Sequence, residues 1–298
     1  MRPLVLLWRF GRPHTLVGTT LSVLGIYVLV AVDLGDVGDR PGDLLATLLA
    51  ALSVNVFITG INQLEDVEID RINKPFLPIA AGDLSLRAGR RIVAASAVLP
   101  VALALTQGPE ETVAVVVALL VGVAYSVPPL RLKRWPALAA LSISGVRALV
   151  VNLGVALHFS LSMADRWHVP TGVWMLTAFV APFSAAIALL KDVPDIEGDR
   201  RYRIATYSVR LGGAVVLRAG LALLGAAYLG IAVAAPFVLD GAAAVFLAAS
   251  HVAALAVLLA AARRADVTDR EDFTRFYLLV WRLFFLEYVI VPLAWVLA

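Results

Sequence analysis

The chain has 298 residues, of which 61% are hydrophobic and 16% charged, and its formal net charge is +3. A soluble globular domain is normally about 45–50% apolar and about 25% charged, so this composition predicts a polytopic membrane protein and argues against a soluble one. The absence of cysteine excludes disulfides and thiolate metal sites.

Nine stretches are apolar for about the 20 residues that a membrane-spanning helix needs. In chain order they cover about 14–33, 43–62, 88–106, 110–127, 136–160, 171–190, 212–235, 241–262 and 276–297. Pro, Gly or Asp lies in several of the breaks, which is typical of short turns between antiparallel helices. The fifth stretch is long and is expected to be tilted or kinked. We expect an all-α fold, a bundle of nine transmembrane helices around a central cavity, with a single domain over residues 1–298.

The positions of the 25 Lys and Arg residues predict the orientation of this bundle. Arg40 and Arg166 fall in connections on one side, whereas Arg147 and Arg282 fall within spans. All the others lie on the opposite side. Because Lys and Arg are enriched in cytoplasmic connections, we expect the N-terminus and the connections after the second and sixth spans in the cytoplasm, and the C-terminus outside.

A cluster of polar and acidic residues follows the second apolar stretch. Asn62, Asp66 and Asp70 are four residues apart, which on one helix places them on one stripe. Carboxylates so close repel one another more as the local dielectric constant falls, so the stripe favours a bound cation. Hard oxygen ligands suit Mg²⁺. The alternative is a solvated helix end whose acids pair with Arg71 and Lys74.

A second acidic cluster follows the sixth apolar stretch. Asp192, Asp195 and Asp199 are spaced by three and four residues, which again predicts one face of a helix. Pro194 lacks an N–H and is expected to kink or restart the helix there, whereas Gly198 allows a close backbone approach. Two acidic clusters facing each other across a helical bundle would hold a metal-bound diphosphate.

Cationic side chains close to these clusters are candidates to bind the diphosphate, because its oxygens need charged donors. We expect this role for Lys74, Arg131, Lys133, Lys191 and Tyr125. For the basic tract at 131–134, the alternative is simple anchoring at the positive side of the membrane.

Arg147 is the most informative single charge, because it lies deep in an apolar span and an intramembrane charge is a functional candidate by default. Asn152 follows it by five residues, and Arg12 lies at the mouth of the first span. The alternative for Arg147 is a structural pair with Glu287 or Asp199. The aromatic residues are dispersed along the chain and predict no box that would stabilise a cation.

With these motifs the chain resembles the UbiA superfamily of intramembrane prenyltransferases, and within it most closely the homogentisate prenyltransferases, including the phytyl and solanesyl enzymes of tocopherol and plastoquinone synthesis. The resemblance runs nearly end to end. It is carried by N-x-x-x-D-x-x-x-D at 62–70, D-x-x-D-x-x-x-D at 192–199, and the flanking stretches 9–15, 71–75, 77–82, 146–154 and 208–212.

The resemblance implies Mg²⁺-dependent transfer of a prenyl group from an allylic isoprenyl diphosphate to an aromatic, homogentisate-like phenolic acid within the membrane. Two Mg²⁺ ions are implied, one held by Asn62, Asp66 and Asp70, the other by Asp192, Asp195 and Asp199. The implied catalytic residues are Asp66, Asp70, Asp195 and Asp199, and the implied acceptor-binding residues are Arg147, Asn152 and Arg12. The partners would be the two substrates and the lipid bilayer, with no nucleic acid. We expect an integral protein of a prokaryotic cell membrane with its active site on the cytoplasmic side.

Two other functions stay open on the sequence. A UbiA-type terpene cyclase would use the same carboxylates without an acceptor, and a related prenyltransferase would use an acceptor other than homogentisate. An ion transporter with intramembrane acids is less favoured, because these acids lie at helix ends rather than in the middle of spans.

Overall fold

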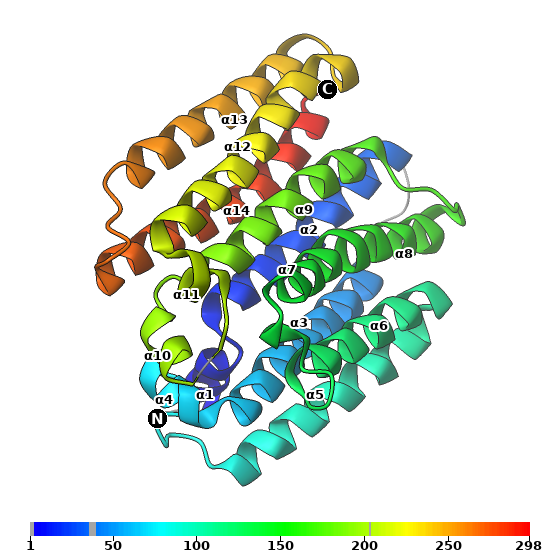
Figure 1. Ribbon diagram of the computed structural model, residues 1–298. Helices are drawn as coiled ribbons and strands as arrows, with labels where there is room; N and C mark the ends of the chain where they lie inside the picture. The colour runs from blue at the N-terminus through cyan, green and yellow to red at the C-terminus, as the bar shows by residue number, and fades with distance from the viewer. Residues whose placement is uncertain (1–2, 36–39, 203) are drawn as a thin grey trace.

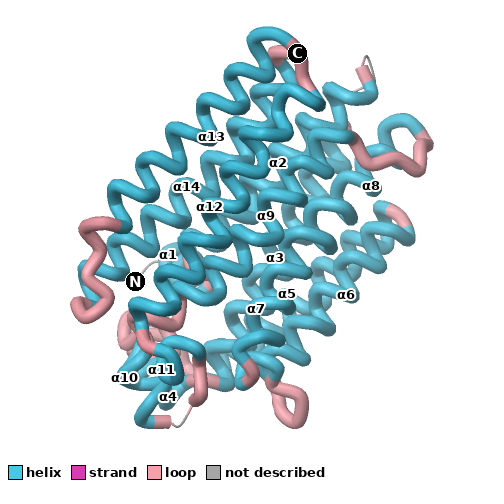
Figure 2. The backbone as a smooth tube through the Cα atoms, turned by 45° about the horizontal axis from the view of Figure 1, so that its top comes forward, coloured by secondary structure: helices cyan, strands magenta, loops and turns pink. Residues whose placement is uncertain are grey.

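A computed structural model describes residues 3–35, 40–202 and 204–298, and within these ranges every regular element is a helix (Figure 1). Nine helices of the described chain are long and apolar enough to cross a membrane. They lie side by side as tilted rods (Figure 2). The prediction of an all-α bundle with nine spans is therefore confirmed.

The structure gives the bounds of each span and of the shorter helices between them. The spans are α2 (Pro13–Leu34), α3 (Pro41–Glu65), α5 (Leu86–Gln107), α6 (Pro109–Ser126), α7 (Pro136–Gly145) with its continuation η2 (Val146–Val151) and α8 (Asn152–Ala164), α9 (Thr171–Leu190), α12 (Gly213–Val238), α13 (Gly241–Ala262) and α14 (Arg270–Val296). The shorter helices are α1 (Pro3–Phe10), α4 (Val67–Asn73), η1 (Leu132–Arg134), α10 (Ile196–Arg201) and α11 (Tyr207–Leu211).

Local sequence explains where several helices begin. Helices α2, α3, α6 and α7 each have Pro in their first turn, where the missing N–H costs no hydrogen bond and the fixed φ favours the helix. Asp269 caps α14 by accepting hydrogen bonds from the backbone N–H groups of Glu271 and Asp272. Helix α14 therefore begins at Arg270, several residues before the predicted start at 276.

The predicted long fifth span is a continuous run from Pro136 to Ala164 that contains one π-helical segment, η2. A π-helical segment makes i→i+5 hydrogen bonds and so changes the helical register, and such segments are often found at functional sites. Arg147 is in this segment.

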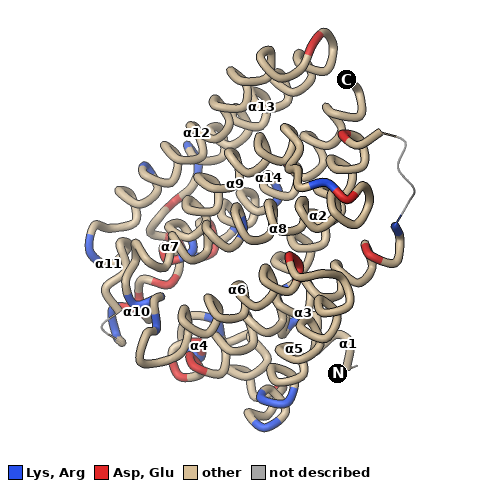
Figure 3. Tube along the Cα trace, turned by 90° about the vertical axis from the view of Figure 1, so that its right-hand side faces the viewer, with Lys and Arg blue, Asp and Glu red and all other residues tan. Residues whose placement is uncertain are grey.

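Neighbouring helices enclose the interior of the bundle. Helix α3 packs against α5 and α6, α9 packs against α7 and α12, and α2 packs against α14. Large side chains such as Val98, Leu105, Val233 and Phe237 are exposed on the outside, as expected for helices that face lipid rather than water. Most Lys, Arg, Asp and Glu residues gather at the end of the bundle that carries α4, α10 and α11 (Figure 3).

Candidate active site

A cavity of about 1300 Å³ opens at this charged end and runs into the bundle. Its walls come from α2, α3, α6, η2, α9 and α14, and its mouth comes from the segments around α4 and α10. Both acidic clusters line this one cavity, although more than 120 residues separate them in sequence: Lys74 and Asp195, which are 121 residues apart, are in contact there.

The first acidic cluster does not lie on a single helix, so that part of the sequence prediction is wrong. Helix α3 ends at Glu65, and Asp66, with φ −113° and ψ 21°, separates it from α4. Asp disfavours helix interiors because its side chain competes for backbone groups. The backbone N–H of Asp66 still bonds to Asn62, and that of Asp70 to Asp66, at 3.0 and 2.8 Å. The spacing therefore survives, and all three side chains line the cavity.

The second cluster follows the same pattern. Asp192 lies in the turn after α9, and Asp195 precedes α10, which contains Asp199. The predicted restart of the helix after Pro194 is confirmed, whereas the prediction of one continuous helical face for all three carboxylates is wrong, because this turn interrupts the helix. All three carboxylates nevertheless line the cavity.

Helices α4 and α10 pack directly against each other at the mouth. The Asn73 amide donates a hydrogen bond to Asp199 at 3.2 Å. A Cβ atom at Gly198 would lie 1.9 Å from Oδ1 of Asn73, so this approach requires glycine, as the sequence predicted. Asp199 also accepts a hydrogen bond from the Thr206 hydroxyl at 3.3 Å and is only 6% exposed.

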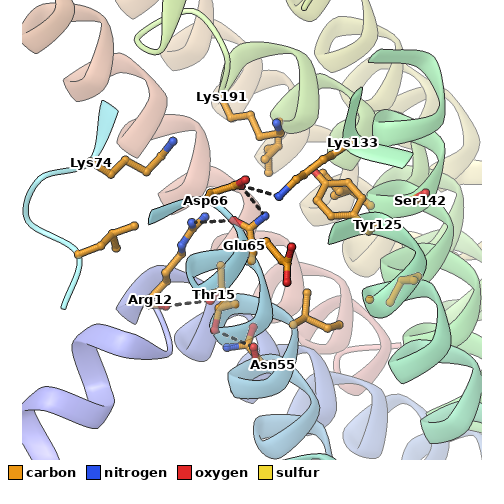
Figure 4. Close-up of a pocket in the computed structure, with 18 of the residues that line it drawn as sticks. Arg12, Thr15, Asn55, Glu65, Asp66, Lys74, Tyr125, Lys133, Ser142 and Lys191 are labelled. Carbon is orange, nitrogen blue, oxygen red and sulfur yellow. Dashed lines mark hydrogen bonds and ion pairs between the residues drawn. The ribbon is translucent and has the colours of Figure 1, made fainter. Parts of the chain in front are cut away.

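Four Lys and Arg side chains form ion pairs with three of the five carboxylates, and Figure 4 shows Lys133 beside Asp66. Asp66 binds Arg131 at 2.9 Å and Lys133 at 2.5 Å. Lys191 binds Asp192 at 2.6 Å, and Lys74 binds Asp195. Together with Tyr125, the residues predicted to bind a diphosphate all line the cavity.

The structure does not support the alternative of a solvated helix end. In that alternative Arg71 and Lys74 would neutralise the first acidic cluster. Arg71 pairs with the exposed Glu68 at 2.7 Å, and Lys74 pairs with the second cluster. The carboxylates of the first cluster face the cavity instead of the solvent beside α4.

Burial disfavours ionisation of the deepest carboxylates. It raises the pKa of Asp70 to about 6, although Lys74 and Arg12 lower it in part. It raises the pKa of Asp199 to about 7, with further contributions from the Asp192 and Asp195 carboxylates. Among the described residues, no hydrogen-bond partner reaches the buried Oδ2 of Asp70. Such groups favour an additional cation.

The acids are not already arranged as a metal site. Within the described ranges, no group of three or more His, Asp or Glu side chains lies close enough to hold an ion. Asp66, Asp192 and Asp195 instead pair with the Lys and Arg side chains described above, and a cation bound there would displace or share these partners.

Arg147 lines the cavity at a deeper level and forms no ion pair with any residue of the described ranges. Its guanidinium carbon lies 4.6 Å from the centre of the Trp281 ring and 5.7 Å from that of Phe284. Its Nη1 is buried and has no hydrogen-bond partner in the part of the chain that the structure describes. Glu287, one suggested partner, is instead hydrogen-bonded to His251 at 3.0 Å, and the other, Asp199, bonds to Asn73 of α4. The structural-pair alternative is therefore not observed.

The aromatic residues are gathered in the structure, contrary to the sequence prediction that they are dispersed. The centres of the His14 and Tyr277 rings lie 4.8 and 6.5 Å from that of the Trp281 ring, and the centre of the Phe284 ring lies 5.8 Å from it. Residues 277, 281, 284 and 288 are aromatic at spacings of four and three, a signal of one helical face that could have been found in the sequence.

The two remaining residues predicted to bind the acceptor differ in position. Arg12 lines the cavity and donates to Asn62 at 3.3 Å. Asn152 is fully buried, bonds to Tyr288 at 3.2 Å and does not line the cavity. A direct contact of Asn152 with a bound molecule is therefore not supported, because helix packing covers its side chain.

Several known proteins are similar to this chain in sequence or in fold. The sequence profile of the UbiA prenyltransferase family matches residues 15–286. Homogentisate phytyltransferase of Synechocystis sp. is 44% identical over 290 residues, which cover 96% of this chain and 94% of the relative. Homogentisate solanesyltransferase of Arabidopsis thaliana is 36% identical over 96% of this chain and 75% of its own length. A UbiA homolog from Archaeoglobus fulgidus, solved with GPP and Mg²⁺, has the same fold, with a TM-score of 0.67 and 18% identity over 96% of this chain and 99% of that chain.

Proposed function

The chain belongs to the UbiA prenyltransferase family, and from this membership and the site we propose that it transfers a prenyl group from an allylic isoprenyl diphosphate to homogentisate. The observation that carries the proposal is the convergence of both acidic clusters and four cations at the mouth of one largely apolar cavity. The names of the Synechocystis and Arabidopsis relatives support homogentisate as the acceptor.

The donor set of the mouth fits Mg²⁺. Carboxylate and amide oxygens are the hard ligands that this ion prefers, and Asp70 offers an unpartnered buried oxygen. We propose two sites, one formed by Asn62, Asp66 and Asp70, the other by Asp192, Asp195 and Asp199. Bound Mg²⁺ supplies positive charge that stabilises the diphosphate as a leaving group. The structure of the Archaeoglobus homolog was solved with this ion.

The cations of the mouth would bind and orient the diphosphate. Lys133 and Arg131 bind Asp66 from the connection after α6, and Lys191 lies at the end of α9. The phosphate oxygens offer these side chains additional charge-assisted hydrogen bonds. Tyr125, at the end of α6, lines the same region and can donate one more. The prenyl group would then point into the apolar part of the cavity.

The acceptor would bind at the level of Arg147. Its carboxylate would contact Nη1 of that guanidinium, which has no partner among the described residues. Arg12 would contact the acceptor closer to the mouth. Asn152 would act only through Tyr288, whose hydroxyl donates a hydrogen bond to the Asn152 side chain. The allylic C–O bond breaks and a ring carbon of the phenol bonds to the first prenyl carbon. The proton of that ring carbon passes to the diphosphate or to a carboxylate of the mouth. The bond between the acceptor's CH2 group and its carboxylate would also break. CO₂ would leave, and the carbon would keep the electron pair and take up one proton, so that the acetate side chain becomes a methyl group.

The protein is integral to the membrane, with nine apolar spans in the part of the chain that the structure describes. We propose a prokaryotic cell membrane as its location and the cytoplasmic face as the side of the cavity mouth. The concentration of Lys and Arg at the α4 and α10 end supports this sidedness.

The experiment that tests the function is a matrix of prenyl diphosphates against phenolic acids, with purified protein in lipid nanodiscs and products identified by mass. We expect Mg²⁺-dependent formation of prenylated homogentisate with loss of CO₂. Prenylation of another phenolic acid but not of homogentisate would contradict the acceptor. A hydrocarbon or alcohol formed from the diphosphate without any phenol would instead indicate a cyclase.

A further inference from the structure

The cavity extends from the charged mouth almost to the other end of the bundle. Two helices line it with one continuous stripe each, at the three- and four-residue spacing of a single helical face. The stripe on α6 consists of Glu111, Ala114, Val115, Ala118, Val121, Gly122 and Tyr125, and the stripe on α3 includes Thr47, Ala51, Val54, Asn55, Ile58, Thr59 and Asn62.

The length of this apolar chamber follows from the helices that line it. Tyr125 lies at the mouth and Glu111 at the far end, and the α6 segment between them is about 21 Å long at about 1.5 Å per residue. Small side chains, such as Ala51 and Ala118, line the middle. An extended chain of four isoprene units is also roughly 20 Å long, since its main-chain carbons are joined by bonds of about 1.5 Å.

The far end of the chamber is polar and tightly packed. Glu111 lines it with only 3% of its surface exposed, beside Thr47, which is 1% exposed. Helices α6 and α8 come so close there that a Cβ atom at Gly154 would lie 3.0 Å from that of Ala114. The apolar stripe therefore ends at a carboxyl group in the first turn of α6.

Glu110 and Glu111 are adjacent but have different surroundings. Glu110 bonds to His158 at 3.1 Å and does not line the cavity. Glu111 faces the chamber. An apolar chain that advanced past Glu111 would cover its carboxyl group without offering it a hydrogen bond. Burying a polar group without compensating hydrogen bonds is costly.

We propose that Glu111, with Thr47, ends the chamber and sets the upper length of the prenyl tail at about four isoprene units. The inference rests on the proposed function and deepens it, because it names the length class of the donor. Glu111 here is a specificity-determining residue and takes no part in the chemistry at the mouth, which lies about 21 Å away along α6.

The test compares kcat/KM for geranylgeranyl diphosphate, with four isoprene units, and geranylfarnesyl diphosphate, with five, at saturating homogentisate. We expect the wild-type protein to prefer the four-unit donor. Glu111→Ala should raise the five-to-four ratio roughly tenfold, since one small group in an apolar pocket changes discrimination by about that factor. Glu111→Gln, which keeps the size and polarity, and the matched control Glu110→Ala should retain the wild-type ratio.

A second variant shortens the chamber and tests the same proposal if Glu111→Ala does not fold. Ala51→Phe should lower the use of geranylgeranyl diphosphate roughly tenfold and leave that of geranyl diphosphate, with two units, unchanged. Leu49→Phe, on the exposed face of the same helix, is its control. Ratios within about twofold of wild type in Ala51→Phe, or in a folded Glu111→Ala, would overturn the inference. Absence of transfer from every donor in the wild-type protein would instead overturn the proposed function.

Discussion

Lys74 follows the first acidic cluster in sequence, but its ammonium group pairs with Asp195 of the second. The two residues are 121 positions apart. The pair joins the segments around α4 and α10, which the Asn73–Asp199 hydrogen bond also connects. A cation of one cluster thus neutralises a carboxylate of the other across the mouth of the cavity.

Replacement of Lys74 tests whether this cation also serves the diphosphate. We expect Lys74→Met to raise the KM for prenyl diphosphate by about ten- to a hundredfold, which corresponds to the loss of one charge-assisted hydrogen bond of about 1.5–3 kcal/mol. Lys74→Arg should retain most of the affinity. Arg71→Met removes a cation from the exposed side of α4 and should have no effect. An unchanged KM in Lys74→Met would show that Lys74 serves only Asp195.

The nine spans could be predicted, most of them within a few residues, because each is a long apolar run and most of the connections between them contain Pro or Gly. Pro194 also indicated the break in the second acidic cluster, but the break at Asp66 could not be predicted in the same way. The spacing of Asn62, Asp66 and Asp70 is compatible with one helix, and the break at Asp66 accompanies its ion pairs with Arg131 and Lys133. These pairs join segments that are far apart in sequence, so local propensity does not reveal them.

The acids and cations of the site could be predicted because charges are rare in an apolar chain. The surroundings of Arg147 could not, because its neighbours Trp281 and Phe284 belong to α14. The partner of Glu287 was missed for the same reason, since His251 is on a different helix. Asn152 was assigned to the acceptor because it lies close to Arg147 in sequence. Sequence distance does not reveal that the Asn152 side chain is hydrogen-bonded to Tyr288.

The carboxylates of the mouth should be indispensable. We expect Asp66→Ala, Asp70→Ala, Asp195→Ala and Asp199→Ala each to abolish transfer, and EDTA to abolish it in the wild-type protein until Mg²⁺ is restored. Glu68→Ala, at an exposed carboxylate of α4, is the matched control and should stay active. Thermal unfolding in nanodiscs should show that the variants remain folded. Substantial turnover in any of the four would remove that residue from the metal site.

The raised pKa values of Asp70 and Asp199, about 6 and about 7, predict that Mg²⁺ binding depends on pH. Protons compete with the cation below these values, so the Mg²⁺ concentration for half-maximal transfer should rise as the pH falls from about 8 to about 5.5. The stability of the metal-free protein should change with pH in the opposite direction to its Mg²⁺ affinity. A raised folded-state pKa means that the folded chain binds these protons more tightly, so stability decreases as the pH rises from about 4 to about 7.

Titrations of Mg²⁺ at several pH values, with thermal unfolding of the metal-free protein over the same range, measure both effects. Asp199→Asn should weaken the pH dependence of metal-free stability, because it removes the group with the higher pKa. A half-maximal Mg²⁺ concentration that stayed constant from pH 8 to pH 5.5 would contradict the prediction.

The orientation in the membrane can be tested with single cysteines, because the native chain has none. We expect Arg40→Cys, in the connection before α3, to react with an impermeant thiol reagent added outside intact cells. Asp83→Cys, in the connection before α5, should react only after the cells are opened. The reverse pattern would mean that the mouth of the cavity faces outward.

Arg147 provides the sharpest test of the acceptor site. In the proposed function the metal sites and the loop cations serve the diphosphate, whereas the Nη1 of Arg147 lies deeper in the cavity and has no hydrogen-bond partner among the described residues. A carboxylate is the anion that a phenolic acid would bring to this depth. Loss of its contact with a desolvated Arg should cost on the order of 2–5 kcal/mol. We therefore expect Arg147→Leu to raise the KM for homogentisate by at least about thirtyfold, with the affinity for prenyl diphosphate nearly unchanged.

The control for Arg147→Leu is Arg282→Leu, because Arg282 also lies within a span but is exposed on the outside of α14, and its loss should leave both KM values unchanged. Arg147→Lys should restore part of the homogentisate affinity, because an ammonium group keeps the charge but not the bidentate geometry. An equal loss of prenyl diphosphate affinity in Arg147→Leu would place Arg147 in the diphosphate site. If a folded Arg147→Leu variant kept wild-type KM values for both substrates, Arg147 would bind neither of them. Its role would then be structural, through its contacts with the Trp281 and Phe284 rings.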